Sequence, residues 1–177
     1  MLLSPDAVGV RARGLRLVLF DVDGVLTNGS ILMHPDGSES KSFSIRDGQA
    51  MMWVQRAGLT VGLLTGRRSE ATARRAAELG ISILAMGDND KRSAYTQIVS
   101  AHGFKDEQVA YMGDDLPDLP VLARVGLAAA PADAVEEVRA RVHWISQHRG
   151  GHGAARDLIE NILRARGRWD ALVRVFG

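Results

Sequence analysis

Two aspartates that end an apolar run are the first residues in this sequence with the types and spacing for chemistry. Asp21 and Asp23 follow residues 17–20, which have the pattern of a buried parallel strand, and Gly24 comes directly after them. Side chains two residues apart on a strand project to the same side, so the two carboxylates are expected to lie close together. Neighbouring carboxylates repel each other unless a cation or a shared proton relieves them. The stretch therefore predicts a metal site at the end of a strand, where the glycine lets the backbone turn sharply.

Three further apolar runs also end in polar groups. The runs 59–64, 81–86 and 109–112 are followed in turn by Thr65, by a polar turn with Lys91, and by the pair Asp114 and Asp115. Right-handed crossovers bring the carboxyl ends of parallel strands to one edge of a sheet, so these groups can converge. A single aspartate after a strand is more often a turn or cap residue. Four such strand ends together favour one functional site.

The types of residue at these strand ends define a reaction class. Carboxylate oxygens in a chain without cysteine favour a hard divalent cation, most simply Mg²⁺. Such a cation, an ammonium group and a hydroxyl together supply the charge neutralisation that a phosphoryl group requires. A carboxylate can also act as a nucleophile and form an aspartyl-phosphate, while a neighbouring carboxylic acid protonates the leaving oxygen and later deprotonates water. The sequence therefore indicates phosphoryl-transfer chemistry.

Alternating strand and helix patterns are expected to position these groups. Further strands are expected at 125–129 and 143–145, and helices near 4–13, 47–57, 69–79, 91–102, 119–124, 133–141 and 154–166. This alternation predicts an α/β fold with a doubly wound parallel sheet. Asp47 is predicted to cap the helix that follows it, and Asp133 with Glu136 resembles a capping pair.

The segment between the first strand and the first helix after it has the pattern of a β-hairpin. Residues 31–33 and 42–45 flank Pro35, Asp36 and Gly37, which have strong turn chemistry. We therefore predict a hairpin insertion over about residues 28–46. Its imperfect alternation indicates that one face buries against another subunit.

Composition and charge fit one globular domain over residues 1–177, with 46% hydrophobic and 24% charged residues. The net charge of +1 gives no basic surplus of the kind that a nucleic-acid-binding face leaves. The absence of cysteine excludes disulfides and permits a reducing compartment. No apolar segment approaches membrane-spanning length, and residues 1–14 lack the apolar stretch of a signal peptide. We therefore expect a cytoplasmic protein that binds neither nucleic acid nor membrane.

Four stretches, in order along the chain, resemble the motifs of the haloacid dehalogenase superfamily. They are residues 21–27, residues 63–67, Lys91 and residues 113–118. The resemblance implies that Asp21 is the nucleophile and Asp23 the acid and base. It also implies that Thr65 and Lys91 bind the phosphoryl oxygens.

The same resemblance implies the residues of a metal site. Mg²⁺ is implied to be held by Asp21, Asp114 and the backbone carbonyl of Asp23. Asp115 and Asp118 are implied to support these groups without touching the reacting atoms, with Asp118 orienting Lys91.

A narrower resemblance covers the chain from Leu15 to Trp169. Residues 37–48, 109–121 and 150–156 look like those of the 3-deoxy-D-manno-octulosonate 8-phosphate phosphatases. That family has no cap domain, and neither 28–45 nor 67–91 is long enough here to fold as a lid. It implies a homotetramer with active sites at subunit interfaces. In such a tetramer the hairpins form a shared barrel, and the tail after the C-terminal helix, within about 150–177, helps to close a neighbour's site. Position 152 in the glycine turn is His152, where some members of the family carry arginine.

The implied activity is Mg²⁺-dependent hydrolysis of 3-deoxy-D-manno-octulosonate 8-phosphate to the free sugar acid and phosphate, for lipopolysaccharide synthesis. A nonulosonate 9-phosphate phosphatase is an alternative with the same motifs. A phospho-receiver domain, whose phosphorylated aspartate stands on a later strand, and an oligomerising module are the non-enzymatic alternatives. The residues considered for binding this substrate are Thr65, Gly66, Arg67, Lys41, Arg46 and Lys91. For Lys41, Arg46 and Arg67, a solvated surface charge is the other interpretation.

Overall fold

The computed structural model describes residues 2–177, and its centre is a parallel sheet of six strands. The strands are β1 (Leu17–Phe20), β4 (Thr60–Thr65), β5 (Ile83–Met86), β6 (Val109–Met112), β7 (Leu127–Ala130) and β8 (Trp144–Ile145). Their order across the sheet is β5-β4-β1-β6-β7-β8, and every pair is parallel. The predicted parallel α/β sheet is confirmed, and β1 lies at its middle between β4 and β6.

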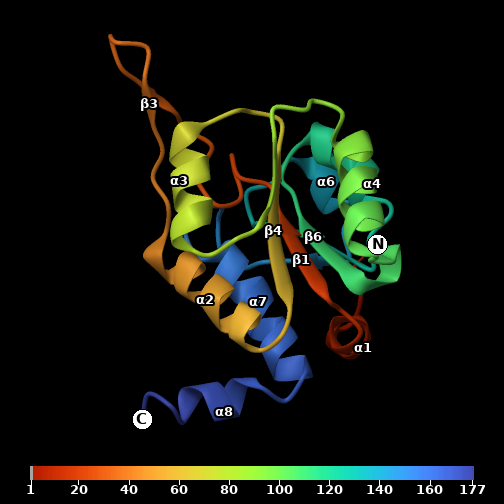
Figure 1. The fold of residues 1–177 in the computed structure, drawn as a ribbon. Coiled ribbons are helices and arrows are strands. Elements are labelled where there is room, and N and C mark those ends of the chain that lie inside the picture. The colour runs from red at the N-terminus through yellow and green to blue at the C-terminus, as the bar shows by residue number, and fades with distance from the viewer. Residues whose placement is uncertain (1) are drawn as a thin grey trace.

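Helices cover both faces of this sheet (Figure 1). One face carries α1 (Pro5–Arg13), α2 (Ile45–Arg56), α3 (Glu70–Glu78) and α7 (Ala154–Ala165). The other face carries α4 (Lys91–His102), α5 (Leu119–Leu122) and α6 (Glu136–Arg139). The short 3₁₀ helices are η1 (Asp106–Gln108) and η2 (Leu116–Asp118), and α8 (Trp169–Val173) follows α7. None of the helices within residues 2–177 is both long enough and apolar enough to cross a membrane.

The side chains of β1 divide the core between the two faces. Val18 and Phe20 pack with α1, α2 and α7, while Leu17 and Leu19 pack with α4 and α5. This is the alternation that a strand imposes, and a strand covered on both faces must be apolar at every position. Burial on both sides fixes β1, so the loop at its carboxyl end starts from a rigid position.

A short hairpin stands away from the sheet between β1 and α2 (Figure 1). Strands β2 (Leu32–Met33) and β3 (Glu39–Ser40) pair antiparallel around the turn at Asp36. The second strand lies earlier than the predicted segment 42–45, so that boundary was wrong. Ser44 instead caps α2, because its side chain accepts a hydrogen bond from the Asp47 amide at 3.3 Å, and Ile45 already belongs to the helix.

Two predicted helix caps were wrong because their carboxylates bind the glycine turn 150–153 and the start of α7. Asp47 lies buried within the first turn of α2 and accepts hydrogen bonds from the amides of Gly153, at 3.2 Å, and Arg156, at 2.8 Å. Asp133 accepts from the Gly150 amide at 2.9 Å, and α6 begins only after Val135. A Cβ atom at Gly150 would lie 1.8 Å from the Gly24 carbonyl oxygen, so the turn packs directly on the loop after β1.

Candidate active site

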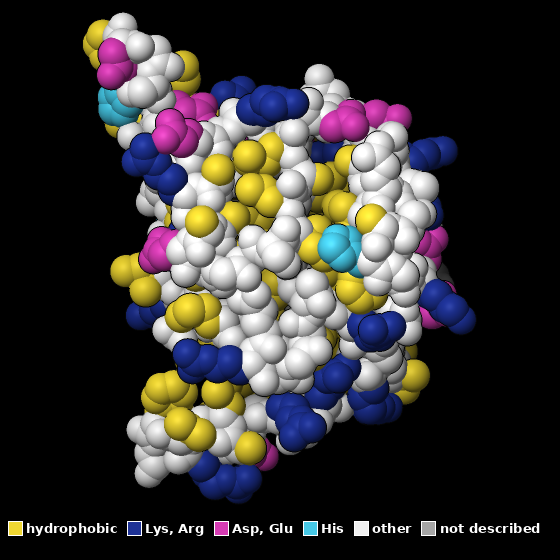
Figure 2. All heavy atoms as spheres, viewed as in Figure 1, with side chains coloured by type: hydrophobic (Ala, Val, Ile, Leu, Met, Phe, Trp, Pro, Cys, Tyr) yellow, Lys and Arg dark blue, Asp and Glu magenta, His cyan; other side chains and the backbone are white. Residues whose placement is uncertain are grey.

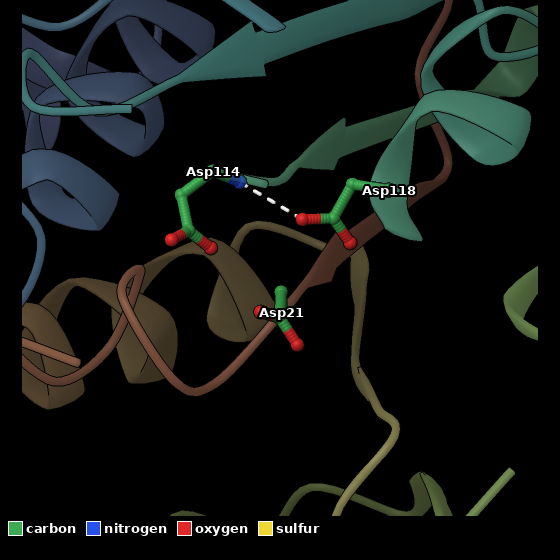
Figure 3. A group of neighbouring side chains, drawn as sticks. All are labelled: Asp21, Asp114 and Asp118. Atoms are coloured by element: carbon green, nitrogen blue, oxygen red, sulfur yellow. Dashed lines mark hydrogen bonds between the residues drawn. The ribbon is translucent and has the colours of Figure 1, made fainter. Parts of the chain in front are cut away.

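Three aspartates meet at the carboxyl edge of the sheet. Asp21 follows β1, and its amide donates to the Met112 carbonyl of β6 at 3.0 Å. Asp114 follows β6 through Gly113, and Asp118 ends η2. Each of the three carboxylates offers one oxygen within 4.8 Å of the other two (Figure 3). The central position of β1 in the sheet therefore brings groups almost a hundred residues apart in sequence into one cluster.

Asp118 organises this cluster with both of its oxygens. Its Oδ1 accepts from Lys91 Nζ at 2.5 Å and from the Tyr111 hydroxyl at 2.6 Å. Its Oδ2 accepts from the backbone amide of Asp114 at 2.9 Å (Figure 3). The same oxygen accepts from the backbone amide of Asp115 at 3.2 Å. Tyr111 was predicted as part of a strand but not as a residue of the site. The signal for it was a tyrosine inside a buried strand, since a buried tyrosine hydroxyl usually finds a partner.

Lys91 is a buried ammonium group held between two carboxylates. It begins α4, and its Nζ lies 2.9 Å from Asp21 Oδ1. Burial acts to lower the pKa of Lys91, but the charges of Asp21 and Asp118 outweigh it and raise the pKa above its ordinary value. The lysine therefore stays charged beside Asp21.

The electrostatics of the aspartates favour a cation. Burial and then the neighbouring charge of Asp118 raise the pKa of Asp21 to about 6. Burial and then the charges of Asp21 and Asp118 raise the pKa of Asp114 to about 8. Asp114 Oδ1 is buried and has no hydrogen-bond partner among the described residues. A buried carboxylate oxygen without a partner is costly, and a divalent cation that prefers oxygen ligands would supply that partner.

Gly24 is the residue that lets Asp114 approach the loop after β1. A Cβ atom at this position would lie 2.0 Å from Asp114 Oδ2, and the backbone φ of +93° also favours glycine. The glycine that follows the two aspartates thus has a steric reason as well as a conformational one.

The Asp23 carboxylate contacts basic side chains and not the other aspartates. Its Oδ1 and Oδ2 accept from Lys41 Nζ at 2.7 and 2.9 Å, and Arg67 Nε lies 4.0 Å from Oδ2. Arg67 in turn donates to Glu39 of β3 at 3.1 Å. Glu39 was not predicted as a site residue. A charge in the short hairpin strand is the only sequence signal for it.

Most of the predicted site residues line one cavity of about 480 Å³. Its lining consists of Asp21, Asp23, Gly29, Thr65, Gly66, Arg67, Asn89, Lys91, Asp114, Asp115, Pro117 and Asp118. Gly29, Asn89 and Pro117 were not predicted, although Asn89 stands in the polar turn before Lys91. Lys41 does not line this cavity, but it contacts Asp23, which does.

Arg46 does not lie in this cavity. It lines a separate pocket of about 290 Å³, together with His148, His152, Gly153, Arg156, Asp157 and Glu160. A larger pocket, of about 550 Å³, lies between α1 and α7 and is lined mainly by these helices and Trp144. The strand-end residues thus gather at the 480 Å³ cavity.

Comparisons with known proteins agree with this geometry. The family model of the haloacid dehalogenase-like hydrolases matches residues 38–126. The 3-deoxy-D-manno-octulosonate 8-phosphate phosphatase KdsC of Yersinia pestis is 41% identical over 160 residues, covering 90% of this chain and 86% of that protein.

Solved structures give the same relationship. A probable YrbI family phosphatase from Pseudomonas syringae has a TM-score of 0.94 at 42% identity and covers 97% of both chains. The 3-deoxy-D-manno-octulosonate 8-phosphate phosphatase of Moraxella catarrhalis, in complex with magnesium ion, phosphate ion and KDO, has a TM-score of 0.95 at 34% identity. That likeness covers 97% of this chain and 99% of the other.

Proposed function

Because this chain belongs to the haloacid dehalogenase-like hydrolases and is a phosphoric monoester hydrolase, we propose that it hydrolyses 3-deoxy-D-manno-octulosonate 8-phosphate to the free sugar acid and phosphate. The observation that carries the proposal is the cluster in which Asp21 lies against Lys91 while Asp118 holds both Lys91 and Asp114. This phosphate ester is the substrate in the name of the Yersinia relative, and its hydrolysis would give the enzyme a place in lipopolysaccharide precursor synthesis.

Mg²⁺ is the proposed cofactor, held by Asp21, Asp114 and the backbone carbonyl of Asp23. The unpartnered Asp114 Oδ1 and the oxygen-only donor set support this assignment. When bound, the cation would neutralise charge on the phosphoryl group and on the two carboxylates.

Asp21 is the proposed nucleophile. One of its oxygens lies 2.9 Å from Lys91 Nζ, and the carboxylate lines the cavity. In the first step a bond forms between an Asp21 oxygen and phosphorus while the bond from phosphorus to the sugar oxygen breaks. Asp23 gives its proton to that leaving oxygen. In the second step water attacks phosphorus, Asp23 takes the water proton, and the bond to Asp21 breaks to release phosphate.

Thr65, Gly66 and Lys91 are proposed to bind the phosphoryl oxygens, since all three line the cavity beside Asp21. Arg67, whose side chain is 52% exposed at the cavity, is the proposed contact for the anionic sugar acid. Lys41 is buried against Asp23, and Arg46 lines another pocket. A direct contact of either residue with substrate stays a prediction.

A homotetramer with active sites at subunit interfaces is part of the proposal. Leu32 and Met33 of β2 are 63% and 61% exposed, and hydrophobic side chains are visible on the projecting arm in Figure 2. Apolar residues on a two-stranded arm favour burial against other subunits. Within one chain, α8 packs on α2 through Trp169 and Trp53, whose ring centroids are 6.0 Å apart. Because α8 is held on α2 of its own chain, the tail that closes this active site would come from a neighbouring subunit.

The test is a phosphate-release screen with Mg²⁺ present. We expect the highest kcat/KM for 3-deoxy-D-manno-octulosonate 8-phosphate, lower values for a nonulosonate 9-phosphate and for simple sugar phosphates, and none for Asp21→Asn. A higher kcat/KM for the nonulosonate ester would replace the proposed substrate by the alternative one. Phosphate that stays bound to the protein without turnover would instead indicate a receiver-like domain.

A further inference from the structure

We propose that Lys41 is a positioning residue that sets the orientation of the Asp23 carboxylate for proton transfer. Lys41 Nζ lies 2.7 Å from Oδ1 and 2.9 Å from Oδ2 of Asp23, so both carboxylate oxygens face one ammonium group. The inference rests on the proposed function, because it requires Asp23 to exchange a proton with the leaving oxygen and with water.

Burial makes this ion pair a strong constraint. The side chain of Lys41 is wholly buried, while that of Asp23 is 18% exposed. A surface ion pair contributes little because its side chains move and water screens it, whereas breaking a buried pair leaves an uncompensated charge. Lys41 therefore cannot turn to solvent, and Asp23 is the carboxylate nearest to its ammonium group.

The neighbouring charges show why a dedicated cation is needed. Arg67 Nε lies 4.0 Å from Asp23 Oδ2 and is the competing cation. Glu39 holds Arg67 at 3.1 Å, and its other oxygen is 3.9 Å from Lys41 Nζ. Glu39 and Lys41 lie two residues apart in the hairpin segment. Glu39 restrains Arg67, and Lys41 restrains Asp23. Without Lys41, Arg67 would be the nearest cation to Asp23 and would draw the carboxylate toward the exposed side of the cavity.

This role differs from direct recognition of the sugar acid by Lys41. A lysine that binds the carboxylate of the substrate matters only for substrates that carry one. A lysine that positions the acid matters for every ester whose leaving oxygen needs a proton. An aryl phosphate has a leaving oxygen that departs without protonation, so it is the substrate that should be least affected.

The experiment therefore compares kcat/KM for three esters with Mg²⁺ present. The esters are p-nitrophenyl phosphate, glycerol 2-phosphate and 3-deoxy-D-manno-octulosonate 8-phosphate, assayed with wild type, Lys41→Met and the exposed-lysine control Lys105→Met. General acids contribute about 10²–10⁴-fold. We expect Lys41→Met to lose about tenfold or more on both alkyl esters and less than about threefold on the aryl ester. Lys105→Met should match wild type on all three.

A double-mutant cycle supplies the readout that a merely structural role would not give. If Lys41 acts through Asp23, then Asp23→Asn and the double variant Asp23→Asn with Lys41→Met should have the same kcat/KM on glycerol 2-phosphate. Additive losses would overturn the proposal. Equal losses on all three esters, or a loss confined to the sugar-acid ester, would also overturn it.

Two further measurements keep the test decisive. Lys41→Gln, whose amide still donates to Asp23, replaces Lys41→Met if that variant does not fold by circular dichroism, and it is expected to show a smaller loss that is again confined to the two alkyl esters. Wild type that releases no phosphate from the sugar-acid ester but turns over the other two would refute the proposed substrate, and the cycle on glycerol 2-phosphate would still decide the role of Lys41.

Discussion

Asp118 accepts a hydrogen bond from Lys91 with one carboxylate oxygen, at 2.5 Å, and holds the Asp114 and Asp115 amides with the other. One side chain thus fixes both the ammonium group beside Asp21 and the loop that carries Asp114. Asp118 therefore couples the position of Lys91 to that of the loop with Asp114.

Asp118→Asn tests this double role. The amide oxygen can still accept from Lys91, but the amide nitrogen would then face the Asp114 and Asp115 amides, where two donors oppose each other. We expect a loss of about 1–3 kcal/mol in the free energy of unfolding, measured with urea, because this is the usual cost of leaving a buried polar group unsatisfied. We also expect kcat to fall at least about tenfold, because an increase of about 1.4 kcal/mol in the barrier is tenfold in rate. Asp36→Asn, in the exposed hairpin turn, is the matched control. Unchanged stability would contradict the dual role.

Asp21→Asn is expected to abolish phosphate release and to preserve the fold. The amide is no nucleophile, but its oxygen can still accept from Lys91 Nζ, which now lies 2.9 Å from Asp21 Oδ1. Phosphate release should fall by at least about 10³-fold, while the circular dichroism spectrum stays that of wild type. Turnover that persists in this variant would refute the nucleophile assignment.

Metal removal should make stability depend on pH in a defined direction. The pKa values of Asp21 and Asp114 are about 6 and about 8 in the folded chain, against an ordinary value of 3.8. At pH values between the ordinary pKa of 3.8 and the raised pKa of each group, the folded state binds more protons than the unfolded state. The free energy of unfolding therefore falls as pH rises toward about 8. Bound Mg²⁺ favours the ionised carboxylates and offsets this fall.

The stabilisation by Mg²⁺ should therefore be larger at about pH 8 than at about pH 5. Urea unfolding with Mg²⁺ and with a chelator, at both pH values, measures it. Activity lost to the chelator should return when Mg²⁺ is restored. Asp114→Asn serves as the control, because its uncharged amide keeps only one oxygen and should bind the cation less well than the carboxylate with its unpartnered Oδ1. A Mg²⁺ effect that is the same at both pH values would contradict the assignment of these carboxylates as ligands.

Leu32→Asp tests the proposed assembly. Leu32 is 63% exposed on the hairpin, and a charge there would be buried without a partner in a shared barrel. We expect light scattering to report a smaller mass than for wild type, and kcat/KM to fall more for the sugar-acid ester than for p-nitrophenyl phosphate. Val10→Asp, on α1 with 62% exposure, is the control with the same change at an equally exposed position. Equal masses for both variants and wild type would rule out a hairpin-mediated tetramer.

The sequence by itself determined the sheet and the cluster at its edge. Buried parallel strands must be apolar at every position, so β1, β4 and β6 were visible as uninterrupted runs, and the polar residue after each run marked the carboxyl edge. The convergence of Asp21 and Asp114 at this edge followed from the topology, whereas the role of Asp118 beside Lys91 was implied by the resemblance to the haloacid dehalogenase superfamily.

Only the tertiary structure decided which partner each polar side chain takes. Asp47 and Asp133 have the local pattern of helix caps, but their carboxylates instead accept hydrogen bonds from amides of the glycine turn and of α7. Asp23 turns away from the aspartate cluster because the hairpin brings Lys41 beside it. Capping is a local competition that sequence describes well, whereas these contacts depend on segments brought together by the packed core. That is why the strand ends were predictable and the partner of Asp23 was not.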